Sequence, residues 1–203
     1  MKTTDEHGHI AFFYGSKKDR TQTLAQYFRE GLEKGELGVF ATPDSPKKVI
    51  SDFRRAGFDI AKYVESGALR IFEMNKTYLP NGKFVAEYMI TNVAVFIEDA
   101  KVLGYTGLRT AGVMDWLKDR PETWAEAFAY EEAVNQLSRK HPSFTGLCLY
   151  PVQGSSDEVL EGAIKTHPRY ISKGKEQNNS LFGSSELGRQ ADREVKKLLT
   201  NQD

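Results

Sequence analysis

An arginine inside an apolar segment is the first feature of the sequence that could do chemistry. Leu108-Arg109-Thr110-Ala111 predicts a short strand, which breaks at Gly112 and is followed by Met114-Asp115-Trp116. A buried arginine needs a partner, because its charge is costly to remove from water. Open α/β sheets bind ligands where their strands end. We therefore predict that residues 104–116 form the floor of a binding site, in which Arg109 donates a charge-assisted hydrogen bond to the ligand.

Glu131 is the predicted partner of Arg109. It follows Trp124 and Phe128 on the apolar side of a helix that should begin near Pro121, so its carboxylate is expected to point inward. The two side chains could then neutralise each other. The pair would serve either as part of a ligand site or as a structural ion pair, and the residues alone leave both interpretations open.

Large side chains near the same strand ends suggest the walls of a pocket. Tyr14, Tyr78, Met114 and Trp116 combine apolar surface with a few polar tips, which is the usual composition of a small-molecule site. Ordinary core packing is the alternative for each aromatic residue. Trp116 is the strongest candidate, because it is expected in a loop beyond a strand end.

Two histidines and the single cysteine complete the candidates. His9 and His167 each lie beside a predicted strand, where they could orient a ligand or together hold a metal. No metal site or cofactor is expected, because no carboxylate or second histidine stands at ligand spacing from either. Cys148 and Tyr150 share one face of a predicted strand. Cys148 with His167 could act as nucleophile and base, but a mid-strand cysteine is usually a small buried apolar residue. We predict ligand contacts at His9, Tyr150 and His167, and no catalytic residue.

The turn at Gly15 occupies the position of a phosphate-binding loop without its motif. In G-x-x-x-x-G-K-[ST], glycine amides surround phosphate and the lysine reaches its outer oxygens. Counted from Gly15, the second glycine is replaced by Arg20 and the lysine by Thr21. Lys17, Lys18 and a helix N-terminus could still hold an anion at residues 15–21, and a solvated turn is the alternative.

Short apolar segments alternate with amphipathic helical patterns, which predicts a three-layer α/β/α domain around a mainly parallel sheet. The strands are expected at residues 10–14, 38–42, 69–72, 108–111, 144–150 and 169–171. Residues 1–174 should form this domain. Residues 175–186 are predicted to be a polar linker, followed by a short amphipathic helix at 187–199 that docks on the domain or on a second copy.

Composition excludes several classes of protein. The chain has 203 residues, and its 28 basic side chains balance 28 acidic ones, so the basic excess typical of nucleic-acid binders is absent. One cysteine cannot form an intramolecular disulfide or a cysteine-based zinc site. No signal peptide or apolar segment of transmembrane length is present. The expectation is a cytoplasmic protein without nucleic-acid or membrane partners.

An ordered series of short motifs resembles the MEDS domain, the sensory domain shared by methanogen and methylotroph proteins and the dichloromethane-responsive repressor. In chain order the motifs are His9-Ile10 with Phe13-Tyr14, Glu30-Gly31-Leu32 with Gly35, Thr77 to Phe84, Gly104-Tyr105, Leu108-Arg109, Gly112 with Met114 and Trp116, Tyr130-Glu131, Cys148-Leu149-Tyr150 and Thr166-His167-Pro168. The segment from Gln26 to Thr42 is also similar to RecA/KaiC-type ATPases. The resemblance implies a RecA/KaiC-like fold with a degenerate phosphate loop.

The same resemblance implies a sensor of small organic molecules, hydrocarbon or one-carbon derivatives, that acts in signalling or transcriptional regulation without catalysis. Movement of the loop at residues 76–83 would pass ligand occupancy to a downstream signalling or DNA-binding protein, and a homodimer is possible. Two alternatives belong to other classes of protein. One is a nucleotide-binding relative of the KaiC-like ATPases, and the other is a protein-interaction scaffold.

Overall fold

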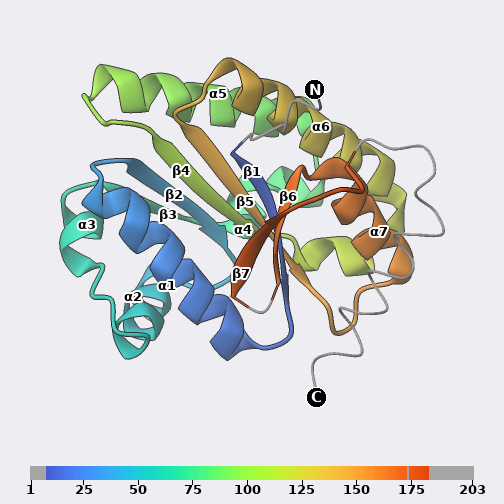
Figure 1. The fold of residues 1–203 in the computed structure, drawn as a ribbon, viewed down its shortest axis with the longest axis horizontal. Helices are drawn as coiled ribbons and strands as arrows, with labels where there is room; N and C mark the ends of the chain where they lie inside the picture. Colours follow the sequence, from blue (N-terminus) through green and yellow to red (C-terminus); the bar gives the residue numbers. More distant parts are fainter. Residues whose placement is uncertain (1–7, 173, 183–203) are drawn as a thin grey trace.

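A computed structural model describes residues 8–172 and 174–182, which form one twisted sheet with helices on both faces (Figure 1). The strands are β1 (His9–Tyr14), β2 (Leu37–Thr42), β3 (Leu69–Glu73), β4 (Leu108–Val113), β5 (Phe144–Pro151), β6 (Arg169–Ser172) and β7 (Lys175–Asn178). The α-helices are α1 (Lys17–Glu33), α2 (Pro46–Arg55), α3 (Ala61–Glu65), α4 (Met74–Thr77), α5 (Ala86–Val102), α6 (Trp124–Lys140) and α7 (Asp157–Thr166). Three 3-10 helices are η1 (Pro80–Gly82), η2 (Asp115–Asp119) and η3 (Pro121–Thr123).

The strand order is β3-β2-β4-β5-β1-β6-β7, and every neighbouring pair is parallel except β6 with β7. The predicted three-layer α/β/α architecture with a mainly parallel sheet is therefore confirmed. The interpretation of residues 175–186 as a linker is wrong at its start, because residues 175–178 form β7 and complete a hairpin with β6. The helix predicted at 187–199 lies outside the described residues.

Local capping signals begin several helices where the sequence predicts them. The hydroxyl of Ser16 accepts the amide N–H of Asp19 at the start of α1. Ser45 caps α2 in the same way, with Pro46 at the first helical position. Ser156 caps α7. These caps set the direction in which each helix leaves the edge of the sheet.

The two faces of the sheet have separate hydrophobic cores. Helices α1 and α2 cover one face, and α5, α6 and α7 cover the other (Figure 1). Alternation along β4 assigns its side chains to these faces. Ala111 and Val113 pack on the α1 side, whereas Leu108 and Met114 pack on the α5–α6 side. Arg109 shares the parity of Ala111 and therefore faces α1.

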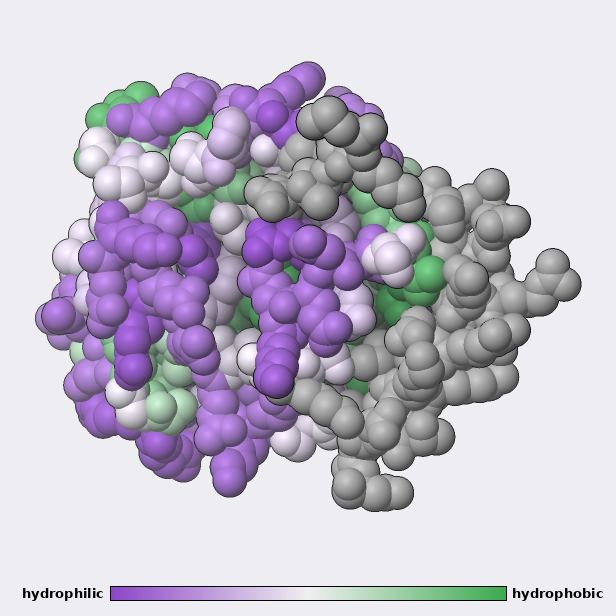
Figure 2. Space-filling view, viewed as in Figure 1, coloured by the Kyte–Doolittle hydropathy of each residue, from purple (hydrophilic) through white to green (hydrophobic). Residues whose placement is uncertain are grey.

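The surface is mostly polar in the view of Figure 2, where hydrophilic side chains cover α1 and its surroundings. A hydrophobic patch lies at the corner where α5 ends. Val102 and Leu103, at that end of the helix, are 83% and 59% exposed. Among residues 8–172 and 174–182, no helix has the length and apolar character needed to cross a bilayer.

Candidate functional site

Arg109 and Glu131, predicted as a pair, do not meet. Arg109 Nε donates to Glu36 Oε2 at 2.6 Å, and Nη1 donates to the backbone oxygen of Tyr27 at 3.1 Å. Its guanidinium also lies 4.6 Å from the ring centroid of Tyr27. Burial alone would lower the pKa of Arg109, but the hydrogen bond that it donates to Glu36 and the charges of Tyr27, Glu36 and Glu30 together outweigh burial, and the pKa is raised. Glu131 lies on the opposite face of the sheet, so the prediction of an Arg109–Glu131 pair is wrong.

The degenerate phosphate loop is a short turn, and two of the cations that follow it, Lys17 and Arg20, are already paired. Only Gly15 and Ser16 separate β1 from α1. Arg20 donates to Asp44 Oδ2 at 2.8 Å, and Lys17 lies 3.5 Å from the same carboxylate. Tyr14, a predicted pocket residue, instead packs in the core on the α1 side and donates its hydroxyl to Asp115.

An apolar cavity of about 220 Å³ lies between the sheet and helices α5 and α6. Most of its lining is aliphatic or aromatic, and includes Val39, Ala41, Met89, Val93, Phe96 and Val134. Polar tips come from Tyr78, Asn92, Thr110, Tyr130 and Cys148. Exposed Lys76 and Tyr88 also border the cavity, which therefore reaches solvent beside α4. The cavity lies over the middle of the strands, whereas the sequence placed the site beyond their ends.

Tyr78 connects this cavity with the predicted aromatic residues. Its ring centroid lies 5.9 Å from that of Trp116 and 6.3 Å from that of Tyr130. The tyrosine hydroxyl lies over Gly112, where an added Cβ would be 2.1 Å from it. Gly112 therefore provides the space that Tyr78 occupies. Met114 and Trp116 are buried in the same core, and the indole N–H of Trp116 has no acceptor among the described residues.

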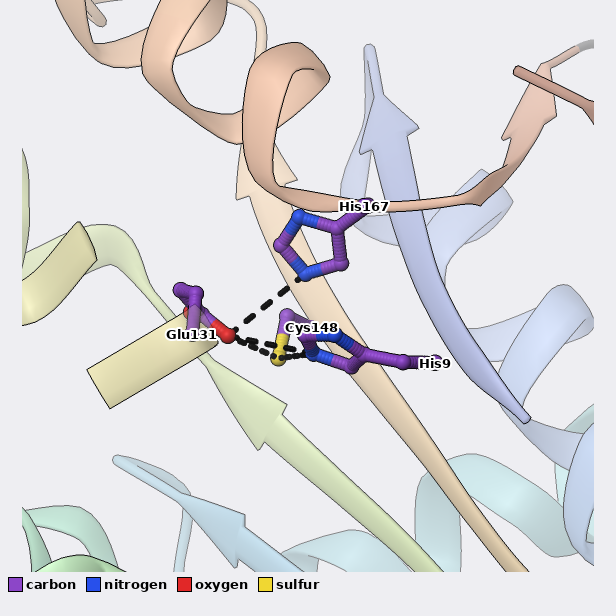
Figure 3. Close-up of side chains that lie close together, drawn as sticks. All are labelled: His9, Glu131, Cys148 and His167. Carbon is purple, nitrogen blue, oxygen red and sulfur yellow. Dashed lines mark hydrogen bonds and ion pairs between the residues drawn. The ribbon is translucent and has the colours of Figure 1, made fainter. Parts of the chain in front are cut away.

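Four buried side chains meet beside the cavity (Figure 3). His9 comes from β1, Glu131 from α6, Cys148 from β5, and His167 from the C-terminal cap of α7. One ligating atom from each of these residues lies within 4.8 Å of the other three. Cys148 belongs to both features, because it lines the cavity as well. The expectation of no metal site rested on spacing along the chain, whereas these four residues are far apart in sequence and meet only in the fold.

Neighbouring groups fix the orientation of each member of this cluster. His9 Nδ1 lies 2.8 Å from Asn135 Oδ1, and His167 Nδ1 lies 2.7 Å from the backbone oxygen of Ala163. The Tyr150 hydroxyl donates to Glu131 Oε1 at 2.8 Å. The predicted residues His9, Glu131, Tyr150 and His167 are therefore brought together.

Burial sets the protonation of the cluster. It lowers the pKa of His167 to about 3, with a further contribution from His9, so the His167 imidazole is neutral at pH 7. Burial and the neighbouring Glu131 raise the pKa of the Cys148 thiol well above its usual value. Burial alone would raise the pKa of Glu131, but the groups around its carboxylate, among them the His9 imidazole and the Tyr150 hydroxyl, outweigh burial and the pKa is lowered. The carboxylate is therefore ionised while completely buried.

The structure divides the predicted site residues into three groups. Tyr78, Met114 and Trp116 lie together near the cavity, and His9, Glu131, Tyr150 and His167 lie together beside Cys148. Tyr14 and Arg109 face α1. Sequence reasoning did not include Tyr130, although its place in the same motif as Glu131 was a signal. The sequence analysis interpreted Cys148 as a buried core residue. Cys148 lies next to His9 only because β1 pairs with β5, and the sequence did not predict that strand order.

The fold and the paired residues of the Gly15 turn define a RecA/KaiC-like α/β domain whose phosphate loop is degenerate. A KaiC-like protein, PH0186 from Pyrococcus horikoshii OT3, has a similar solved structure, with a TM-score of 0.58 and 15% identity over 81% of this chain and 71% of that chain. At this identity the likeness shows the fold alone. A comparison with curated proteins gave no match.

The family is shown by sequence. The model of the family described as "MEthanogen/methylotroph, DcmR Sensory domain" matches residues 8–168. The chain therefore belongs to the MEDS family, which confirms the resemblance found in the sequence. The family's description assigns it a sensory role.

Proposed function

We propose that this domain senses a small, largely apolar organic molecule that binds in the cavity between the sheet and helices α5 and α6. The cavity itself is the observation that supports this function. Small-molecule sites are mostly apolar concavities with a few placed polar groups, and the lining has this composition. The cavity reaches solvent beside α4, so a ligand could enter without unfolding of the core.

The cavity volume favours ligands of a limited size. A cavity of about 150 Å³ in another protein holds benzene, so a volume of about 220 Å³ suits a compact molecule somewhat larger than benzene. Halogenated methanes, short alcohols and simple hydrocarbons fit this description. Tyr78, Tyr130 and Cys148 would provide the polar contacts that distinguish among them.

Nucleotide binding is disfavoured by the same features. A nucleoside triphosphate is larger than the cavity, and the turn at Gly15 is too short to surround its phosphates. The nearby groove between α1 and α2 contains four cations, Lys17, Lys18, Lys48 and Arg55, and Asp52 pairs with all of them except Lys18. An anion would have to displace these ion pairs.

Transmission would begin at the segment that borders the mouth of the cavity. Residues 74–82 form α4 and η1 between β3 and α5, and they contain Tyr78 and the positive-φ residue Asn81. A ligand that contacts Tyr78 would shift this segment and the start of α5. A downstream signalling or DNA-binding protein would respond to that shift.

Thermal unfolding with a panel of chlorinated methanes, short alcohols, benzene and hexane tests the proposal. A ligand present at about 100 times its Kd stabilises the folded state by about 2.7 kcal/mol. For a domain of this size, the Tm should rise by roughly 5–10 °C. Mg-ATP at millimolar concentration should produce no such rise.

Two valines of α5 provide a matched pair of variants. Val93 is buried and lines the cavity, whereas Val95 is 51% exposed on the outer side of the helix. Val93→Phe should fill the cavity and abolish the Tm rise, whereas Val95→Phe should preserve it. The proposal fails if no compound in the panel stabilises the wild-type chain, or if Val93→Phe retains the response.

A further inference from the structure

The cluster beside the cavity contains a buried acceptor, His167 Nε2, that no donor of the described residues reaches. Asn135 donates its amide N–H groups to Glu132 and to the backbone oxygen of Thr166, so its Oδ1 faces His9 as an acceptor. His9 Nδ1 must therefore carry a proton. The backbone oxygen of Ala163 requires the same of His167 Nδ1. A neutral His167 with its proton on Nδ1 presents the lone pair of Nε2 to the centre of the cluster, where His9 Nε2 also lies.

Glu131 adds a third acceptor at the same point. Its Oε2 lies 3.1 Å from His9 Nε2 and 3.5 Å from His167 Nε2. The Cys148 thiol has one proton, which it donates to Glu131 at 3.3 Å. His167 Nε2 is completely buried, and no group among residues 8–172 and 174–182 makes a hydrogen bond with it. Buried polar atoms are rarely left in this state, and a cation bound by the four groups would satisfy this nitrogen.

We propose that His9, Glu131, Cys148 and His167 bind a divalent transition-metal ion, Zn²⁺ or an ion of similar preference, through His9 Nε2, His167 Nε2, Cys148 Sγ and Glu131 Oε2. This proposal does not rest on the proposed organic-ligand function, although Cys148 borders both sites.

The distances among the four atoms match a tetrahedral ligand set. Zinc bonds of about 2.0–2.2 Å to nitrogen or oxygen and about 2.3 Å to sulfur give tetrahedron edges of about 3.3–3.6 Å. Glu131 Oε2 lies 3.1 Å from His9 Nε2, 3.3 Å from Cys148 Sγ and 3.5 Å from His167 Nε2. Cys148 Sγ lies 3.5 Å from His9 Nε2. The other two edges do not exceed 4.8 Å. Small side-chain adjustments would therefore complete the coordination.

Charge and ligand type favour the same class of ion. Binding would form a metal–sulfur bond and release the Cys148 proton to solvent, leaving a thiolate and a carboxylate around an ion of charge +2. The buried site would then be neutral. Imidazole with thiolate is a ligand set preferred by Zn²⁺ over Mg²⁺ or Ca²⁺. Four protein ligands fill a tetrahedral shell, as in structural zinc sites.

The surrounding groups have the arrangement found around bound metals. Metal-ligating histidines donate their second N–H to an amide, carbonyl or carboxylate oxygen, which fixes the ring. Asn135 and Ala163 accept these N–H groups from His9 and His167. Tyr150 holds the second oxygen of Glu131. An ion here would join β1, β5, α6 and the end of α7 in the core.

Cobalt substitution of the full-length chain tests the site directly. After chelator treatment, the wild-type protein should take up about one Co²⁺ or Zn²⁺ per chain, because four ligands define a single site. The Co²⁺ form should show the strong visible bands of tetrahedral geometry and a near-ultraviolet band from thiolate-to-metal charge transfer. No uptake, or uptake without the thiolate band, would overturn the proposal.

Variants assign the spectrum to these residues. Cys148→Ser should remove the charge-transfer band, and His167→Gln should lower affinity by more than about 100-fold, because even outer partners of a metal are worth 10–100-fold. His141→Gln, at the C-terminal cap of α6 and outside the cluster, is the matched control. An unchanged Cys148→Ser spectrum overturns the site. If a variant does not fold, the wild-type spectrum still decides.

Discussion

Replacement of Arg109 by methionine distinguishes a structural arginine from a ligand-binding one. Arg109 and Arg70 both lie in strands, and each contacts an acid at 2.6 Å. They differ in burial. The side chains of Arg109 and Glu36 are 11% and 18% exposed, whereas those of Arg70 and Asp99 are 26% and 41% exposed. Arg70→Met is therefore the matched control.

The expected costs follow from that burial. Arg109→Met leaves Glu36 and the Tyr27 backbone oxygen without their partner. Breaking a fully buried pair costs about 3–5 kcal/mol, and the partial exposure of Glu36 reduces this to about 2–4 kcal/mol of unfolding free energy. Arg70→Met should cost about 0–1 kcal/mol, because its pair is more exposed to solvent.

Urea unfolding with both variants measures this difference, and equal m-values would show that the unfolded states are comparable. Ligand-induced stabilisation should be unchanged in Arg109→Met, since its side chain faces α1 and the cavity lies on the other face of the sheet. Equal costs for the two variants would refute the assigned burial. A folded Arg109→Met protein without a ligand response would restore Arg109 as a ligand contact.

Three further variants test other parts of the structure. Tyr150→Phe removes the donor to buried Glu131 and should lower stability by about 1–3 kcal/mol in calorimetry; no loss would contradict that hydrogen bond. Asn179→Ala should lower the free energy of unfolding by about 1–3 kcal/mol, because Asn179 donates to the backbone oxygens of Ile164 and His167. Asn178 is exposed, so Asn178→Ala should leave stability unchanged in the same urea assay. Gly112→Ala should cost about 1–3 kcal/mol by displacing Tyr78, and combination with Tyr78→Phe should recover part of that loss; an additive double variant would disprove the contact.

The sequence predicted the fold well because its signals are local. Ser16, Ser45 and Ser156 mark the starts of helices, and apolar segments alternate with helical periodicity along the chain. The inward orientation of Glu131 was also predictable, since it continues an apolar helical stripe. The β6–β7 hairpin was missed because residues 175–178 are polar and every side chain in β7 is exposed.

Sequence reasoning failed where the outcome depends on the face of the sheet or the order of strands. A shift of one residue in β4 would turn Arg109 from α1 toward α6, and no local pattern in Leu108-Arg109-Thr110 fixes that choice. His9 and Cys148 meet because β1 pairs with β5, although the chain between them contains three other strands. The predicted pairing of Arg109 with Glu131 was wrong because the sequence does not fix the face of the sheet to which Arg109 points. The cluster was not predicted because the sequence does not fix the order of the strands.

The position of β1 has a consequence for synthesis of the chain. β1 is made before the other described strands, yet it lies between β5 and β6, which are made much later. Pairings between distant segments form slowly, because the entropy cost of closing a long loop comes before the stabilising contacts form. On the ribosome, one edge of β1 stays unpaired until β5, which begins at residue 144, emerges, and the other until β6, which begins at residue 169, emerges. His9 cannot contact His167 until that residue has also been made. The side-chain cluster therefore forms late, and a chain interrupted before α7 ends would expose an apolar strand edge to chaperones and proteases.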